Sequence, residues 1–205
     1  MILKKIIQLS REYRLSVIKI FIYEFFYIIR GFKGNSFNIN KNQRVTDNIP
    51  CPYFFLKKII GFVKEKKINS LIDLGCGSGR SIFFFNKIYK INYFGIEYFE
   101  SIYLKCCKLF EKDNNVVIIN EDFMNFDFLK IDSNCYFIND PLKSKNELQN
   151  LILRIIKKND QLNKLVYFIL VNINKEKLNI FNEYELIHSM KMGSRGFYIF
   201  TNQKR

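Results

Sequence analysis

The residues from Asp73 to Gly79 combine a carboxylate with three glycines at alternate positions, Gly75, Gly77 and Gly79. They follow an apolar run and precede a segment with helical spacing of apolar residues. Glycine lets the backbone adopt positive φ and approach a ligand closely, while the start of the following helix offers free N–H groups to a carboxylate. The pattern therefore predicts a turn that cradles a small ligand, rather than a plain strand–turn–helix connection.

Two classes of ligand compete for such a turn. A dinucleotide site has the spacing G-x-G-x-x-G, and Arg80 occupies the position of its third glycine. The observed spacing, with Asp73 two residues before the first glycine, resembles motif I of the class I S-adenosylmethionine-dependent methyltransferases, D/E-x-G-x-G-x-G. This resemblance covers roughly residues 50–201, and motif I is its specific part. A nicotinamide oxidoreductase remains a further alternative, which the glycine spacing disfavours.

The resemblance implies S-adenosyl-L-methionine as the cofactor and assigns roles within the turn. Asp73 is expected near the ammonium group of the cofactor, and Gly75 and Gly77 are expected beside its methionine moiety and ribose. Cys76 and Gly79 complete the predicted cofactor turn, and a small side chain such as that of Cys76 fits there by size. We expect no metal ion in the site.

Further positions match the family in chain order. Glu97 ends the next predicted strand, where an acidic side chain can accept hydrogen bonds from both ribose hydroxyls. Tyr98 is expected against the adenine. By resemblance, Asp122 accepts from the adenine amino group and the backbone N–H of Phe123 meets the ring. Glu121 is the alternative to Asp122, and a turn or helix-capping aspartate is the structural alternative to both.

Asn139 and Asp140 are the candidate catalytic residues, because class I methyltransferases place substrate-facing residues at the end of the fourth strand. Asn139 is also a candidate cofactor contact. Methyltransferases that act on nucleobase amines often carry D/N/S-P-P-aromatic at this point. Asp140-Pro141 matches half of that motif, while Leu142 and Lys143 depart from it. Asp-Pro is also a common turn dipeptide, which is the structural alternative.

Alternating strand and helix patterns predict a Rossmann-like α/β fold, with a seven-stranded, mostly parallel sheet and helices on both faces. A short final connection predicts an antiparallel hairpin at the C-terminal end. The expected strands are Ser70–Leu74, Asn92–Glu97, Val116–Asn120, Cys135–Asn139, Lys164–Val171, Tyr184–Met190 and Gly196–Thr201. The expected helices are Tyr53–Lys66, Arg80–Tyr89, Ser101–Lys112 and Lys145–Lys158.

The N-terminal segment predicts a separate helical extension, residues 1–48, before a cofactor-binding domain of residues 49–205. Leu15–Ile29 is nearly all apolar, but Lys19 and Glu24 interrupt it, so the segment is too short and too charged for a membrane span. Such a helix needs cover from the domain, a second subunit or a membrane surface. Its narrow polar stripe comprises Glu12, Ser16, Lys19, Tyr23, Tyr27 and Arg30.

Composition limits the remaining choices. The chain of 205 residues is 48% hydrophobic, which suffices for a folded core. Five cysteines without a CxxC pair, and one histidine, argue against a disulfide framework and a structural zinc site. We therefore expect a cytoplasmic protein, with peripheral contact at the inner face of the membrane as an alternative.

The net charge of +14 suits a polyanion such as nucleic acid, but a lysine-rich composition alone would also produce it. The sequence predicts an active methyltransferase with an unidentified acceptor, which could be protein, RNA or a small molecule. The alternative is an inactive cofactor-binding or membrane-associated scaffold that has kept the fold.

Overall fold

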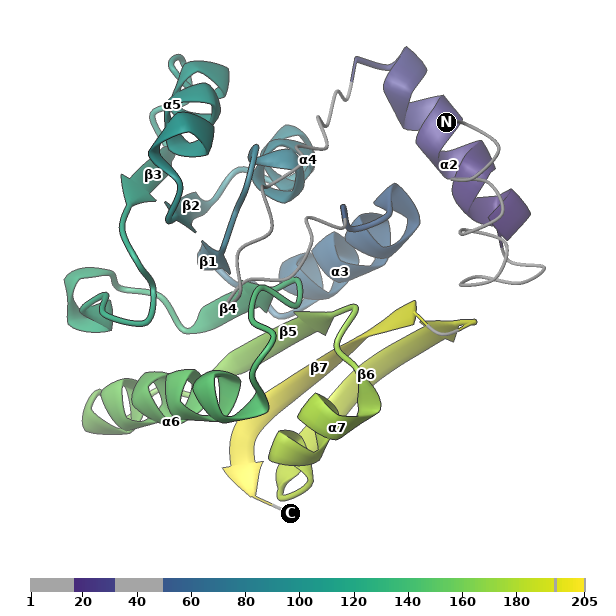
Figure 1. The fold of residues 1–205 in the computed structure, drawn as a ribbon. Helices are drawn as coiled ribbons and strands as arrows, with labels where there is room; N and C mark the ends of the chain where they lie inside the picture. Colours follow the sequence, from purple (N-terminus) through teal and green to yellow (C-terminus); the bar gives the residue numbers. More distant parts are fainter. Residues whose placement is uncertain (1–16, 32–49, 194, 205) are drawn as a thin grey trace.

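The computed structural model describes residues 17–31, 50–193 and 195–204, and these form a seven-stranded sheet with helices on both faces (Figure 1). The strands are β1 (Ser70–Leu74), β2 (Asn92–Glu97), β3 (Val116–Asn120), β4 (Cys135–Ile138), β5 (Tyr167–Val171), β6 (Tyr184–Met192) and β7 (Arg195–Lys204). The α-helices are α2 (Val17–Ile29), α3 (Tyr53–Glu65), α4 (Arg80–Ile88), α5 (Glu100–Leu109), α6 (Lys145–Gln161) and α7 (Lys175–Leu178). Two short 3-10 helices are η2 (Phe128–Lys130) and η3 (Asn179–Phe181).

The sheet has the order β3-β2-β1-β4-β5-β7-β6. The pairs among β1 to β5 are parallel, whereas β7 pairs antiparallel with both β5 and β6. This confirms the predicted fold class and its C-terminal hairpin. The order reverses between β1 and β4, and in open α/β sheets such a switch point marks the crevice where ligands bind.

Alternate residues of the central strands build two cores, one on each face of the sheet. Along β4, Cys135 and Phe137 belong to the core covered by α3 and α4, and Tyr136 and Ile138 belong to the core covered by α6. The central strands are therefore buried on both faces, and this packing holds their carboxyl ends in place. Those ends carry the candidate site.

Two features of the connections differ from the expectation. The strand patterns did not predict α7 or η3, which lie between β5 and β6. The hairpin strands are longer than predicted, so that β6 extends to Met192 and β7 begins at Arg195, with Gly193 in the turn at φ 66°. Glycine takes this left-handed conformation without steric cost, which lets both strands continue almost to the turn.

Helix α2 packs against the domain through the centre of its predicted polar stripe. The Tyr23 ring lies 5.0 Å from that of Phe54, and Tyr27 is buried with its ring 5.0 Å from that of Phe84. The opposite face remains apolar and exposed, with Phe25 68% exposed. Glu12 and Ser16 of the stripe lie outside the described residues, and the predicted division at residue 48 stays a prediction. None of the helices in the described ranges is long and apolar enough to span a membrane.

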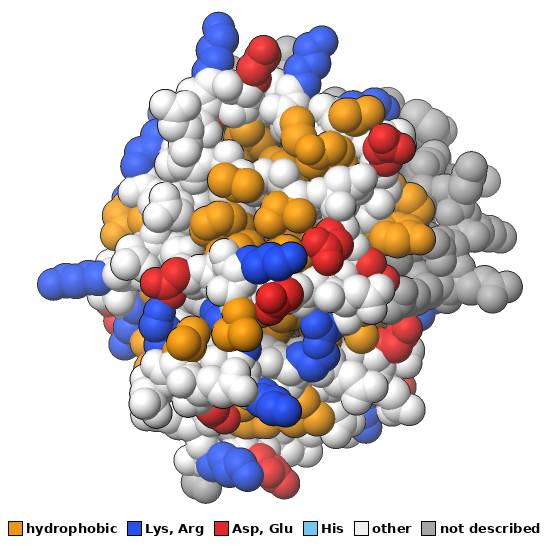
Figure 2. Space-filling view, turned by 90° about the vertical axis from the view of Figure 1, so that its left-hand side faces the viewer, with side chains coloured by type: hydrophobic (Ala, Val, Ile, Leu, Met, Phe, Trp, Pro, Cys, Tyr) orange, Lys and Arg blue, Asp and Glu red, His pale blue; other side chains and the backbone are white. Residues whose placement is uncertain are grey.

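The edge of the sheet at β3 also exposes apolar side chains. Figure 2 shows hydrophobic side chains on this side of the molecule, with Lys, Arg, Asp and Glu distributed among them. Leu104 and Leu109 of α5 and Val117 of β3 are among the exposed apolar residues of the described chain. On this face, the basic side chains do not gather into one continuous patch.

Candidate functional site

The glycine turn after β1 has the backbone that its sequence predicts. Gly75, Gly77 and Gly79 all have positive φ, at 77°, 56° and 78°. The backbone N–H groups of Gly75 and Cys76 donate to the carbonyl of Ile96, at 2.9 and 3.1 Å, which ties the turn to β2. Left-handed φ at three alternate positions is the backbone that the predicted cradle requires, and glycine adopts it without steric cost.

Gly79 and Cys76 also have packing roles in this turn. A Cβ atom on Gly79 would lie 2.6 Å from the Phe110 ring and 2.8 Å from the Cys106 sulfur, so α5 leaves no room for a side chain. Cys76 is buried, and a hydrogen bond with Cys106, together with burial, raises the pKa of its thiol well above the usual range. Cys76 is therefore a neutral packing residue at neutral pH.

Two buried carboxyl groups, Asp73 and Glu97, lie at the ends of the neighbouring strands β1 and β2. Glu97 accepts from the backbone N–H of Gly77 through Oε2 and from that of Phe99 through Oε1, both at 2.9 Å. Burial raises the pKa of Glu97, and these backbone hydrogen bonds oppose the rise. Burial, and secondly the charge of Glu97, raise the pKa of Asp73 to about 8. Two buried acids create a site that favours a cation.

The loop after β2 presents Tyr98 and fixes its backbone. Tyr98 is exposed, and its ring lies 5.2 Å from that of Phe99 in an edge-to-face arrangement. Asn120, at the end of β3, donates to the carbonyls of Glu97 and Tyr98, at 2.9 and 3.1 Å. The sequence analysis did not assign Asn120 a role, although its position at the end of a strand beside β2 was a usable signal.

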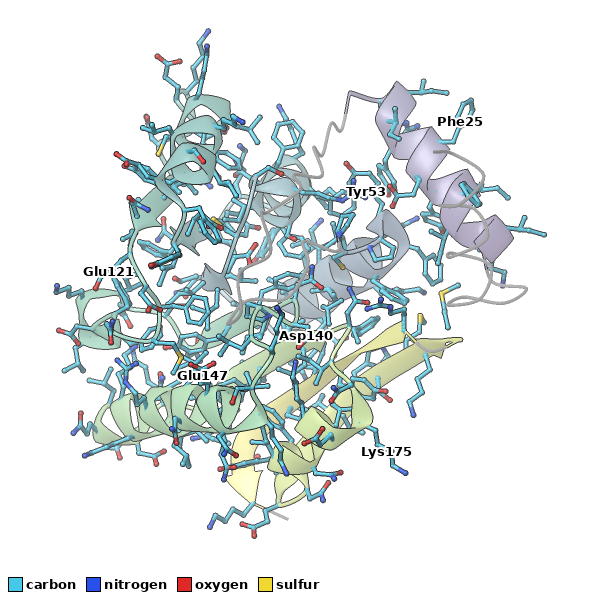
Figure 3. The ribbon with its side chains drawn as sticks, viewed as in Figure 1. Phe25, Tyr53, Glu121, Asp140, Glu147 and Lys175 are labelled. Atoms are coloured by element: carbon cyan, nitrogen blue, oxygen red, sulfur yellow. The ribbon has the colours of Figure 1, made fainter. Side chains whose placement is uncertain are left out.

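Asp122 and Phe123 lie on the loop after β3, beside the glycine turn. The Asp122 side chain accepts from the backbone N–H of Met124 at 2.9 Å, which is the turn-forming role. Phe123 is buried, and its ring would lie 3.7 Å from a Cβ atom on Gly75. The structure thus places both residues near the turn, while their adenine contacts stay a prediction. Glu121, labelled in Figure 3, lies on the same loop.

Asn139 and Asp140 follow β4 and are held by residues from the loop after β5. The side-chain amide of Asn172 donates to Asn139 Oδ1 at 2.8 Å, and the Lys177 ammonium donates to Asp140 Oδ1 at 2.5 Å. Burial raises the pKa of Asp140, while the Lys177 ammonium and the Arg195 charge oppose the rise. The sequence analysis missed all three of these partners.

The loop after β4 touches the glycine turn. A Cβ atom on Gly75 would lie 3.2 Å from the Cβ atom of Pro141, so the two loops meet at the switch point between β1 and β4. This contact joins the predicted cofactor residues to the predicted acceptor residues. Asp140 also has positive φ, 42°, which is uncommon for a residue other than glycine and is found more often at functional sites.

Glu24 of α2 forms an ion pair with Arg80, the first residue after the glycine turn. The Arg80 guanidinium pairs with both carboxylate oxygens of Glu24, at 2.8 and 2.6 Å, and lies 3.7 Å above the Tyr53 ring. The Arg80 Nε donates to the carbonyl of Cys51 at 3.2 Å. Asp73 acts electrostatically on the Cys51 thiol, so this segment lies beside the acidic pair. The sequence analysis noted Arg80 only as a departure from a dinucleotide motif.

Among the described residues, no group of three or more His, Cys, Asp and Glu side chains could hold a metal ion. The site there consists instead of a backbone cradle, two buried acids at β1 and β2, and a braced Asn–Asp pair at β4. It can bind a cationic, hydroxyl-bearing ligand on one side and a hydrogen-bonding group on the other.

No family model matches the sequence, and no curated protein matches it. Solved structures do match the fold. An RNA methyltransferase from Salinibacter ruber in complex with S-adenosyl-L-homocysteine has a TM-score of 0.59 at 13% identity, over 77% of this chain and 95% of that one. Magnesium protoporphyrin IX methyltransferase from Synechocystis with bound S-adenosylmethionine has a TM-score of 0.55 at 10% identity, over 72% and 78%.

A third match is the N-methyltransferase NodS from Bradyrhizobium japonicum, with a TM-score of 0.53 at 8% identity, over 73% of this chain and 97% of that one. These identities are low, so the likeness rests on strand order and on the placement of helices. The chain therefore has the Rossmann-like fold of the class I S-adenosylmethionine-dependent methyltransferases.

Proposed function

We propose that this protein binds S-adenosyl-L-methionine at the ends of β1 and β2 and transfers its methyl group to an acceptor held at the end of β4. The observation that carries the proposal is the turn of three positive-φ glycines beside the buried pair Asp73 and Glu97. The cofactor carries an ammonium and a sulfonium group, and buried carboxylates favour such charges. The glycine spacing, with Arg80 in the position of the third glycine of a dinucleotide motif, disfavours a dinucleotide.

Each residue has a defined task in this proposal. Asp73 attracts the ammonium group, and Glu97 accepts from the ribose hydroxyls while its backbone hydrogen bond to Gly77 keeps the turn in shape. The bound cofactor supplies an already activated methyl group, so the protein must mainly align the acceptor and exclude water. Asn139 and Asp140 align the acceptor, and a hydroxyl or ammonium acceptor would in addition need Asp140 to take a proton.

We rank the possible classes of methyl acceptor by the observations that support each of them. RNA comes first, because the chain has a net charge of +14 and one of the structures with this fold is an RNA methyltransferase. Protein and small molecules follow. The inactive scaffold considered from the sequence is less supported, because the structures with this fold named above are methyltransferases.

Calorimetry with S-adenosyl-L-homocysteine, S-adenosyl-L-methionine and NAD tests the cofactor assignment. We expect both adenosyl ligands to bind and NAD not to bind, and binding of NAD alone would refute the assignment. The acceptor is then sought by incubating the protein and radiolabelled cofactor with an extract of the source cell, followed by separation into RNA, protein, lipid and small-molecule fractions. Label in RNA that vanishes after ribonuclease treatment would support RNA, and label in another fraction would replace it. Cofactor binding without label in any fraction would favour the scaffold.

A further inference from the structure

The loop after β5 and the helix α7 that follows it supply two buried polar side chains that bind the predicted acceptor residues. Asn172 donates to Asn139, and Lys177 donates both to Asp140 and to the backbone carbonyl of Leu142. Figure 3 labels Asp140 after β4 and Lys175 at the start of α7, the helix that also carries Lys177. The two bonded pairs thus connect the ends of two neighbouring strands, β4 and β5.

This arrangement is costly for the fold. Lys177 is 3% exposed, and a buried ammonium costs several kcal/mol that its ion pair offsets only with good geometry. The side-chain oxygen of Asn172 is buried without a hydrogen-bond partner, which also costs free energy. Asn172 and Asp140 both have positive φ, 57° and 42°. Apolar residues would fill the same space at lower cost, and strain of this kind concentrates at functional sites.

Local structure aims Lys177 at its partners. The Asn174 side chain caps α7 by accepting from the backbone N–H of Lys177 at 2.9 Å. This hydrogen bond holds the backbone of Lys177 in place. Its ammonium then holds the carboxylate of Asp140 and the backbone two residues later. Because Pro141 packs against Gly75, Lys177 sets the position of the acceptor loop relative to the cofactor turn.

We propose that Lys177 and Asn172 are positioning residues for methyl transfer. Lys177 holds the Asp140 carboxylate, and Asn172 orients the Asn139 amide, so that both face the acceptor in one geometry. This inference rests on the function proposed above. The groups that act on the charge of Asp140 are Lys177 from α7 and Arg195 from β7. Loss of Lys177 leaves Arg195 to oppose burial, so the carboxyl should hold its proton to a higher pH.

The test compares Lys177→Met and Lys177→Arg with wild-type protein, and Lys175→Met is the matched control, because Lys175 is exposed on the same helix. Methyl transfer to the labelled acceptor fraction should fall about tenfold to a hundredfold in Lys177→Met, as expected for a misplaced acceptor group. Lys177→Arg should restore part of the rate, and Lys175→Met should match wild type. Affinity for S-adenosyl-L-homocysteine should stay within about twofold in all three, because the cofactor residues are unchanged.

A second measurement needs no acceptor. A carbon-13 NMR titration of the Asp140 carboxyl, assigned with Asp140→Asn, should give a pKa about one unit or more higher in Lys177→Met than in wild type. If Lys177→Met does not fold, Asn172→Ala and Lys177→Arg carry the rate comparison. Normal rates and an unchanged titration would show that the ion pair is structural only and overturn the proposal. Failure of wild-type protein to bind S-adenosyl-L-homocysteine would instead refute the proposed function.

Discussion

Asp73 should make cofactor binding depend on pH in the neutral range. Burial, and secondly the charge of Glu97, raise the pKa of Asp73 to about 8. A cationic ammonium group beside it favours the ionised carboxylate, so binding should release the proton that Asp73 holds. At pH 6, two units below this pKa, only about 1% of the carboxyl is ionised, since each pH unit changes the ratio tenfold. Affinity should therefore rise with pH up to about 8.

The size of the effect follows from the same pKa. Between pH 6 and pH 7.5 the affinity for S-adenosyl-L-homocysteine should rise by up to about 25-fold, if only the ionised form of Asp73 binds the ammonium. Calorimetry in two buffers with different ionisation enthalpies should show close to one proton released at pH 6.5. The variant Asp73→Asn should bind more weakly at pH 7.5 and lose both the slope and the proton release. The exposed carboxylate variant Glu111→Gln is the control and should behave like wild type.

A flat affinity between pH 6 and pH 7.5 in wild-type protein would refute this reasoning. So would an Asp73→Asn variant that keeps the full slope, because another group would then carry the proton. Either outcome would remove Asp73 from the ammonium contact. It would leave the glycine turn and Glu97 as the remaining support for the cofactor site.

The remaining predictions concern stability, the ribose contact, glycine packing and the outer face of α2. Because the folded-state pKa of Asp73 is raised, its contribution to stability is full below the unfolded pKa of about 4 and is lost as pH rises through about 8. Urea unfolding of the empty protein should show this decline, and Asp73→Asn should flatten it. Glu97→Ala should weaken S-adenosyl-L-homocysteine binding about tenfold to a hundredfold, since charged hydrogen bonds contribute about 1.5–3 kcal/mol. Calorimetry measures this change, and an unchanged affinity would contradict the assignment of Glu97 to the ribose. Gly79→Ala should lower the unfolding free energy by about 1–3 kcal/mol, because its Cβ would overlap Phe110. If the variant unfolds in urea at the same concentration as wild-type protein, α5 moves aside to accommodate the methyl group. If the exposed face of α2 contacts a membrane, flotation with anionic vesicles should recover wild-type protein but not Phe25→Asp, whose side chain interrupts that face. Wild-type protein that stays in solution would exclude the membrane contact, and sedimentation would then test self-association.

The backbone of the glycine turn, the predicted cofactor cradle, could be predicted because its signals are local in sequence. The three glycines after β1 have their positive φ within five residues of one another, and Asp73 lies two residues before them. Glu97 was predictable as well, since it ends the next strand of an alternating pattern. Even here, the pattern did not show that Glu97 would hold the turn itself through the backbone N–H of Gly77. That contact spans 20 residues and depends on how β1 and β2 pair.

The surroundings of Asn139 and Asp140, the proposed acceptor residues, were only partly predictable, because their partners are distant in the chain. Lys177 lies 37 residues after Asp140 and is one of 33 basic residues, most of which look alike in sequence. Nothing in a Lys-Glu-Lys segment predicts that one lysine is buried. A weak signal existed in Asn174, a capping residue that starts a short helix directly after β5. Recognition of that helix would have placed Lys177 near the end of β4, though not on Asp140.

Helix α2 shows why composition alone did not predict which side of a helix is covered. From the sequence, the cover could have been the domain, a second subunit or a membrane surface. In the structure Tyr27 is buried, and Glu24 pairs with Arg80 against the domain. The reason is that Arg80 follows the glycine turn and needs a counter-ion where α3 and α4 begin, 56 residues away from Glu24 in sequence. Glu24, which is not one of the stripe residues, pairs with Arg80 on the side where Tyr23 and Tyr27 pack against the domain, while apolar residues such as Phe25 are left outside. Hydrophobic periodicity measures segregation of side chains, whereas the partners that the helix meets, here the Arg80 charge and the Phe84 ring, decide which face turns inward.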